Sequence, residues 1–145
     1  MRINEILAGK AGQQVVTIPP DATVRELVTL LGQHNVGALV VSSDGTTVDG
    51  IVSERDVVRH LGADESVLNA PVSTIMTAQV HTADPGEALD ELMQLMTDHR
   101  IRHVPVVVDG ALAGIISIGD VVKSRIGELE FERDQIESFV QSQQT

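Results

Sequence analysis

Two Ser-x-x-Asp segments have residue types and a spacing that could bind a ligand. The first is formed by Ser53 and Asp56, and the second by Ser117 and Asp120. Each stands where a predicted strand gives way to a predicted helix. The first turn of a helix offers free backbone N–H groups and a positive dipole end, which favour an anion such as phosphate. The Asp could accept two hydrogen bonds from a ribose diol, each contributing roughly 1.5 to 3 kcal/mol.

The same spacing has a purely structural interpretation. Ser-x-x-Asp is a capping box, in which each side chain satisfies a backbone group at the start of the helix. Capping and ligand binding can coexist in one segment, so the residues alone leave both roles open.

These segments belong to a unit that the chain contains twice. At an offset of 65 positions, matching residues run from Val15 and Val80 to the Asp-Gly pairs at 44–45 and 109–110. One residue then drops out, and the match resumes at an offset of 64, from Gly50 and Gly114 onwards. Matches this numerous in one order indicate an internal duplication.

Hydrophobic periodicity and turn residues predict the same elements in both copies. The first copy is expected to contain a strand, a helix, a hairpin and a second helix, over Val15–Ile18, Thr23–His34, Val36–Val41, Val48–Val52 and Ser53–Gly62. The second repeats this order over Val80–Thr82, Glu87–His99, His103–Val108, Leu112–Ile116 and a helix from Gly119. We therefore divide the chain into repeat one (1–62), a linker (63–71), repeat two (72–125) and a helical extension (126–145). Because each half is short for a stable domain, we expect the halves to share a core.

The last predicted helix continues beyond the end of its counterpart in repeat one. Its apolar residues alternate at spacings of three and four, with Arg133 where another apolar residue was due; they are Val122, Ile126, Leu129, Ile136 and Val140. One interpretation is a helix that packs on its own domain. The other is a helix that joins two copies of the chain.

Composition excludes several classes of function. The 145 residues carry a formal net charge of −11 and only 1% aromatic residues, which disfavours a nucleic-acid partner on both electrostatic and stacking grounds. Cysteine is absent, so disulfides and thiolate metal sites are excluded. No apolar run approaches the length of a membrane span. We expect a soluble, cytoplasmic protein with no membrane partner.

The whole arrangement resembles a tandem pair of CBS domains, the cystathionine β-synthase type repeat that is also called a Bateman module. The resemblance covers Ile3 to Arg125 and rests on three motifs, Val72–Thr77, Ile101–Val106 and Gly114–Val122, the last echoed by Gly50–Val58. It implies an α+β fold of two β-α-β-β-α repeats packed about a pseudo-twofold axis, with an extended C-terminal helix. It also implies that adenine nucleotides or other adenosyl ligands bind in clefts between the repeats.

By this resemblance, the start of the central strand in one repeat faces the Ser-x-x-Asp segment of the other. One cleft then combines Ser53, Arg55 and Asp56 with Ile101, Arg102 and His103. The second combines Ser117 and Asp120 with Val36, Gly37 and Ala38. The first gathers two Arg and a His and is expected to be the better phosphate site, unless Arg102 is merely exposed and solvated. The second has a small, neutral wall that suits adenine or an uncharged adenosyl group.

The resulting hypothesis is a non-catalytic regulatory module that changes the orientation of its repeats, or its oligomer, when ligand binds. The candidate regulatory ligands are AMP, ADP, ATP and S-adenosylmethionine, with no required cofactor and no metal. We expect a homodimer that signals to an unidentified partner protein. The alternative is a ligand-free module that acts only by dimerising. A hydrolase is a remote third hypothesis, because Ser117 lacks the Gly-x-Ser-x-Gly elbow.

Overall fold

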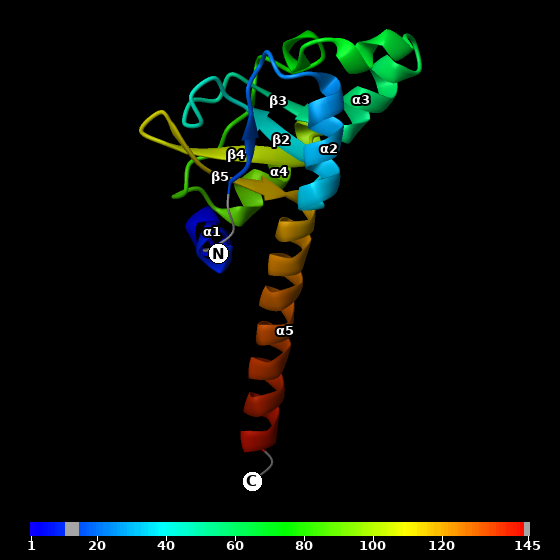
Figure 1. Ribbon diagram of the computed structural model, residues 1–145. Helices are drawn as coiled ribbons and strands as arrows, with labels where there is room; N and C mark the ends of the chain where they lie inside the picture. The colour runs from blue at the N-terminus through cyan, green and yellow to red at the C-terminus, as the bar shows by residue number, and fades with distance from the viewer. Residues whose placement is uncertain (11–14, 144–145) are drawn as a thin grey trace.

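The computed structural model describes residues 1–10 and 15–143 and has an α+β fold (Figure 1). In chain order, the elements are α1 (Ile3–Gly9), β1 (Thr17–Ile18), α2 (Val24–His34), β2 (Ala38–Val41), β3 (Gly50–Ser53), α3 (Glu54–Leu61), the 3₁₀ helices η1 (Glu65–Asn69) and η2 (Val72–Thr74), α4 (Leu89–His99), β4 (His103–Val108), β5 (Ala111–Ser117) and α5 (Ile118–Gln143). Both copies of the duplicated unit therefore contain a helix, two strands and a second helix, in the predicted order.

The strands form one small sheet in each repeat. In repeat one, β1 runs parallel to β2 and β2 pairs antiparallel with β3, so that Leu39 lies opposite Val52. In repeat two, β4 and β5 are antiparallel, with His103 opposite Ser117. Because each Ser stands at the last position of its strand, both Ser-x-x-Asp segments lie at a strand-to-helix junction, as the sequence predicted.

The predicted strand Val80–Thr82 is wrong. None of its three residues joins the sheet, and the nearest pairing is the parallel bridge of the following residue, Ala83, with Val106. His81 and Thr82 are exposed, and the ring of His81 stacks on that of His99 instead of alternating into a sheet. In repeat one, β1 forms but begins two residues later than predicted, at Thr17.

The hairpin turns follow the predicted Asp-Gly pairs. In the first, Asp44 Oδ1 accepts hydrogen bonds from the backbone N–H groups of Thr46 (2.9 Å) and Thr47 (2.8 Å). In the second, Asp109 and Gly110 have φ values of 52° and 80°, the left-handed conformation that a two-residue hairpin requires. Asp and Gly tolerate this conformation better than other residues, which explains their recurrence at this point.

The hydrophobic core consists of two clusters, and each contains residues from both halves of the chain, so the halves share core residues as expected. Each cluster is completed by the segment that precedes the other repeat. Ile3 and Ile6 of α1 lie in the cluster of repeat two, whereas Val72 and Ile75 lie in the cluster of repeat one. Burying one Ile side chain contributes roughly 1.5 to 3 kcal/mol, which is large beside a typical domain stability of about 5 to 15 kcal/mol.

Backbone hydrogen bonds fix both exchanged segments. The N–H of Ile3 donates to the Glu87 carbonyl at 3.0 Å, in repeat two. The N–H of Val72 donates to the Ala22 carbonyl at 2.7 Å, in repeat one. The predicted linker 63–71 is also part of the body rather than a free connection, because Val67 and Leu68 of η1 pack against the core of repeat one.

One helix leaves the body of the molecule. Figure 1 shows α5 starting beside the sheets and extending away from them to the C-terminus. Val121 is buried in the core of repeat two, but every described residue from Leu129 onwards is exposed. Packing on its own domain is therefore the wrong interpretation for this part of the helix. The boundary proposed between residues 125 and 126 lies inside the continuous helix. Among the described helices, none combines the length and apolar character that crossing a membrane requires.

Equivalent glycines hold the exchanged segments close to the sheets. A Cβ at Gly114 would lie 2.7 Å from Cδ2 of Leu7, and a Cβ at Gly50 would lie 2.6 Å from Sδ of Met76. A Cβ at Gly50 would also lie 2.9 Å from the backbone oxygen of Thr77, which cannot rotate away. These approaches are closer than carbon atoms tolerate, so the backbone needs glycine here.

We predict that Gly50→Ala destabilises the protein by about 1 to 3 kcal/mol, because the added methyl group overpacks the contact with Met76 and Thr77. The matched control is Gly32→Ala in α2, where an added Cβ has no neighbour within 4 Å. The control should stabilise the helix by about 0.5 to 1 kcal/mol. Chemical denaturation of both variants measures the two effects. Equal stabilities would show that the exchanged segment has no close contact at Gly50.

Candidate ligand cleft between the repeats

The first Ser-x-x-Asp segment forms a complete capping box at the start of α3. The N–H of Ser53 donates to Asp56 Oδ2 at 2.9 Å, the hydroxyl of Ser53 donates to the same oxygen at 3.1 Å, and the N–H of Asp56 donates back to Ser53 Oγ at 3.4 Å. The capping interpretation is therefore confirmed for this segment. The two bonds that the carboxylate accepts both use one oxygen, Oδ2.

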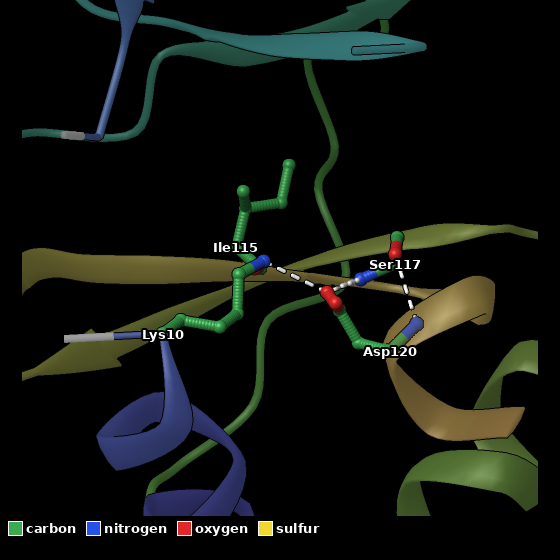
Figure 2. A network of polar contacts seen from close by, with 4 residues as sticks. All are labelled: Lys10, Ile115, Ser117 and Asp120. Carbon is green, nitrogen blue, oxygen red and sulfur yellow. Dashed lines mark hydrogen bonds and ion pairs between the residues drawn. The ribbon is translucent and has the colours of Figure 1, made fainter. Parts of the chain in front are cut away.

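The second segment makes the same reciprocal pair and adds a cation. The N–H of Ser117 donates to Asp120 Oδ2 at 2.9 Å, and the N–H of Asp120 donates to Ser117 Oγ at 3.1 Å. As Figure 2 shows, Lys10 reaches the same carboxylate from the end of α1. Its Nζ lies 2.7 Å from Asp120 Oδ2 and 2.8 Å from the carbonyl oxygen of Ile115.

These contacts set the charge state of Asp120. Burial raises its pKa, but the hydrogen bonds from Lys10 and Ser117 and the charge of Lys10 together outweigh burial, so the pKa of Asp120 lies below its ordinary value. At neutral pH the pair is an ion pair, and each side chain is 25% exposed. Because Lys10 and Asp120 are 110 positions apart, the contact ties the N-terminal helix to the start of α5.

The starts of the two central strands meet between the repeats. A Cβ at Gly37 would lie 3.4 Å from two ring atoms of His103 and 3.6 Å from Glu54 Oε1. Each strand start is also bonded to the helix of its own repeat, since Gly37 O accepts from the Glu54 N–H (2.9 Å) and Arg102 O accepts from the Ile118 N–H (2.8 Å). The structure thus brings Gly37 and His103, from opposite repeats, into contact.

His103 is not a cation at neutral pH. Burial lowers its pKa below 6.5, and the positive charges of Arg102 and Lys10 act in the same direction. The carboxylates of Glu54 and Asp120 raise the pKa but do not compensate for burial. The expected contribution of His103 to a phosphate site is therefore that of a hydrogen-bonding ring, not of a positive charge.

A cavity of about 590 Å³ lies at the second of the two predicted clefts. Both repeats contribute to its walls, together with the end of α1; the lining residues are Leu7, Lys10, Val15, Val16, His34, Asn35, Val36, Ala38, Leu39, Val40, Ala113, Gly114 and Ile115. Apolar side chains dominate this lining, and among the described residues that form it only Lys10 carries a permanent charge. A pocket of this size and character suits a small, mostly apolar ligand with one anionic group.

Of the predicted residues of this cleft, Val36 and Ala38 line the cavity directly. Asp120 lies behind Lys10, to which it is bonded. The predicted residues of the first cleft, Ser53, Arg55, Asp56, Ile101, Arg102 and His103, lie outside this lining. Arg55 and Arg102 are exposed, which is the solvated arrangement that the sequence left open for Arg102.

The two clefts differ in the side chains at equivalent positions. Val16 and His34 line the cavity, and at the offset of 65 their counterparts in repeat two are His81 and His99. Those two rings stack with centroids 3.9 Å apart and an interplanar angle of 27°. The duplicated fold therefore places a valine and a histidine in the lining of the cavity where the equivalent positions of repeat two hold two stacked imidazoles.

Sequence reasoning missed Lys10, His34 and the strand residues Ala113–Ile115. The sequence could have indicated the strand residues, because they directly precede a Ser-x-x-Asp segment. Nothing in the sequence indicates Lys10 as a site residue, because it lies far from Asp120 along the chain. No group of three or more His, Asp or Glu side chains suited to a metal ion occurs within residues 1–10 and 15–143.

The comparisons with known proteins agree with this fold. The family model described as CBS domain matches residues 11–63 and again residues 72–127. The chain therefore belongs to the CBS domain family, as a tandem pair. A mitochondrial CBS domain-containing protein of Arabidopsis thaliana, CBSX3, is 40% identical over 126 residues, which are 83% of this chain. This chain spans 61% of that relative's length.

Solved structures show the same arrangement. A CBS-domain containing protein from Agrobacterium tumefaciens is 43% identical, with a TM-score of 0.81 over 86% of this chain and 99% of its own. A CBS domain protein from Pyrobaculum aerophilum, complexed with AMP, is 32% identical, with a TM-score of 0.73 over 83% of this chain and 89% of its own. The CBS domain pair of protein MJ0100, in complex with 5′-methylthioadenosine and S-adenosyl-L-methionine, is 25% identical, with a TM-score of 0.76 over 88% of this chain and 98% of its own.

We predict that His103 titrates below pH 6.5 in the folded protein, because burial between the repeats disfavours the imidazolium. The titration of its ring protons, followed by NMR, measures this pKa. The urea-unfolded chain is the control, since its histidines should titrate near 6.5. The unfolded state then binds the proton more readily, so this group's contribution to stability is present above pH 6.5 and is lost as pH falls through the folded pKa. A midpoint above 6.5 would contradict the assignment.

Proposed function

We propose that this protein is a non-catalytic regulatory module that binds an adenosyl ligand in the cavity between its repeats. The observation that supports this most is the cavity itself, which is lined by both repeats and adjoins the Lys10–Asp120 pair. The AMP, 5′-methylthioadenosine and S-adenosyl-L-methionine complexes of the related pairs support the ligand class. AMP, ADP, ATP and S-adenosylmethionine remain the candidates.

The apolar wall of the cavity suits the adenine ring. Val16, Val36, Ala38 and Ile115 come from both repeats and can cover the two faces of a flat base. The ribose would lie toward Asp120. Within the described chain, the hydrogen bonds to this carboxylate use Oδ2, which leaves Oδ1 as the acceptor for a ribose hydroxyl.

The first cleft is a second candidate site on the same module. Ser53 and Asp56 would again supply the helix start and the ribose acceptor, with Ile101 beside the base. Since His103 is neutral, any phosphate there would depend on the charges of Arg55 and Arg102. Both Arg side chains are exposed, so screening by salt weakens their attraction for a phosphate. We therefore assign the primary site to the cleft that contains Lys10.

Signalling would depend on the contribution of both repeats to the walls of the cavity. A ligand that contacts both repeats stabilises one relative orientation of them, and it can shift the equilibrium only by its difference in affinity between orientations. The change would reach a partner protein through the surface of the body or through α5, whose Asp120 is bonded to the lining residue Lys10. This helix extends beyond the body (Figure 1).

A homodimer joined through α5 is part of this proposal. Val122, Ile126, Leu129, Ile136 and Val140 are between 46% and 64% exposed. Their alternating spacing of three and four residues is that of a helix that pairs with a like helix. The same stripe supports the alternative function, in which the chain binds no ligand and acts only by dimerising.

Ligand binding is tested by thermal unfolding with AMP, ADP, ATP, S-adenosylmethionine and GTP. A ligand at about 100 times its dissociation constant should stabilise the protein by about 2.7 kcal/mol, or roughly 5 to 10 °C. We expect a shift with at least one adenosyl compound and none with GTP. No shift with any compound would favour the ligand-free module.

The equivalent Asp residues provide the matched pair for this experiment. Asp120→Ala should weaken ligand binding by about tenfold or more, because it removes a charged acceptor from the ribose. Asp56→Ala removes the same capping interaction from the other cleft and should have a smaller effect. Isothermal titration calorimetry compares the two directly. Equal affinities in both variants and the wild type would disprove the ribose role of Asp120.

The dimer prediction concerns the stripe on α5. Replacing Leu129 and Ile136 together by Asp should halve the mass of the particle in light scattering, because each change places a charge in the helix pair. The control is Ser138→Asp, which adds a charge to the same exposed helix outside the stripe. A chain truncated after Arg125 should behave as the double variant does. An unchanged mass for the double variant and the truncated chain would eliminate α5 as the interface.

A further inference from the structure

We propose that Lys10 makes this cavity selective for an adenosine that carries a 5′-phosphate, and this inference rests on the proposed function. Lys10 is anchored at the end of α1, whose Ile3 and Ile6 are buried in the core of repeat two. Its side chain is only 25% exposed and lines the cavity with its ammonium group between Asp120 and the carbonyl of Ile115 (Figure 2).

The charge of the lining is the first part of the argument. Among the described residues of the lining, His34 is the other titratable side chain and none is a carboxylate. Asp120 lies outside this lining and is bonded to Lys10. A ligand that enters the cavity therefore meets the ammonium group of Lys10 in mostly apolar surroundings, where electrostatic interactions are stronger than in water.

The second part concerns what happens when a ribose approaches Asp120. The carboxylate already accepts hydrogen bonds from the Ser117 N–H and from Lys10. A ribose hydroxyl that donates to Asp120 Oδ1 leaves the contact between Oδ2 and Lys10 in place. The ammonium group of Lys10 has three N–H donors, and Asp120 and the Ile115 carbonyl accept from two of them. The third can donate to a phosphate on the same ligand, as Lys commonly does.

These contacts set the order of affinities. A nucleoside monophosphate binds both Asp120 and Lys10, whereas a neutral nucleoside binds Asp120 alone. A ligand with a positive sulfonium near the ribose is repelled by the charge of Lys10. The equivalent position of the other cleft differs. At the offset of 69 that aligns Ile3 with Val72, the counterpart of Lys10 is Gln79, which carries no charge.

The test compares AMP with adenosine by isothermal titration calorimetry at one fixed salt concentration. We expect the wild type to bind AMP about tenfold or more tightly than adenosine. Lys10→Met keeps the apolar stem, removes the charge and should abolish this ratio, mainly through weaker AMP binding. Lys10→Arg keeps the charge and should preserve a preference for AMP. Lys123→Met, an exposed position on α5, is the matched control for the loss of one positive charge.

The outcomes separate this inference from the proposed function. If the wild type and Lys10→Met bind both compounds with the same AMP-to-adenosine ratio, Lys10 does not recognise the phosphate, although the module still binds adenosyl ligands. If Lys123→Met lowers the ratio as much as Lys10→Met does, the effect is long-range charge, and the inference is wrong. If the wild type binds neither compound, the proposed function fails and this inference with it.

Discussion

The reciprocal exchange of leading segments is the interaction on which the rest of this structure depends. Ile3 and Ile6 complete the core of repeat two, while Val72 and Ile75 complete the core of repeat one. Neither cluster is complete without a segment from the other half, so neither repeat has an independent core. The two halves are therefore joined by apolar burial, and a cleft forms between them.

The exchange also builds the site. Because α1 is anchored in repeat two, its end delivers Leu7 to Gly114 and Lys10 to Asp120. The cavity is thus lined by the end of α1, the start of β2 and the middle of β5, three segments that are distant in sequence. Capping of α5 by Ser117 and Asp120 also helps to build the site, because it fixes the carboxylate that Lys10 contacts. Structural and binding roles coexist in these residues because capping engages only part of the carboxylate.

Much of the fold follows from the sequence because its determinants are local. The Asp-Gly hairpins, the capping boxes and the helix over Val24–His34 depend on residues within a few positions of one another, and all were predicted. The duplication also predicted that strands beginning near Gly37 and His103 occupy equivalent places. The strand Val80–Thr82 was predicted wrongly because composition resembling Val15–Ile18 does not reveal that His81 stacks on His99.

The site could be predicted only in part, because its chemistry depends on long-range contacts. The resemblance to CBS domain pairs implied that Val36, Ala38 and Asp120 lie at one cleft, but the contact between Lys10 and Asp120 joins residues 110 positions apart. The charge of His103 likewise depends on burial between the repeats, which residue type cannot disclose.

Because local contacts determine the fold and long-range contacts determine the site, the two clefts of this duplicated fold can differ. The residues that distinguish the clefts are Lys10, Val16 and His34 on one side and Gln79, His81 and His99 on the other. None of them is among the buried residues of the two core clusters, although Val16 packs against the cluster of repeat one. Substitutions at the other positions change the charge and shape of one cleft while the exchanged segments keep both cores intact. The features that the two repeats share therefore stabilise the fold, and the residues by which the repeats differ determine ligand selectivity. One cleft can thus acquire its own ligand selectivity while the common fold is kept.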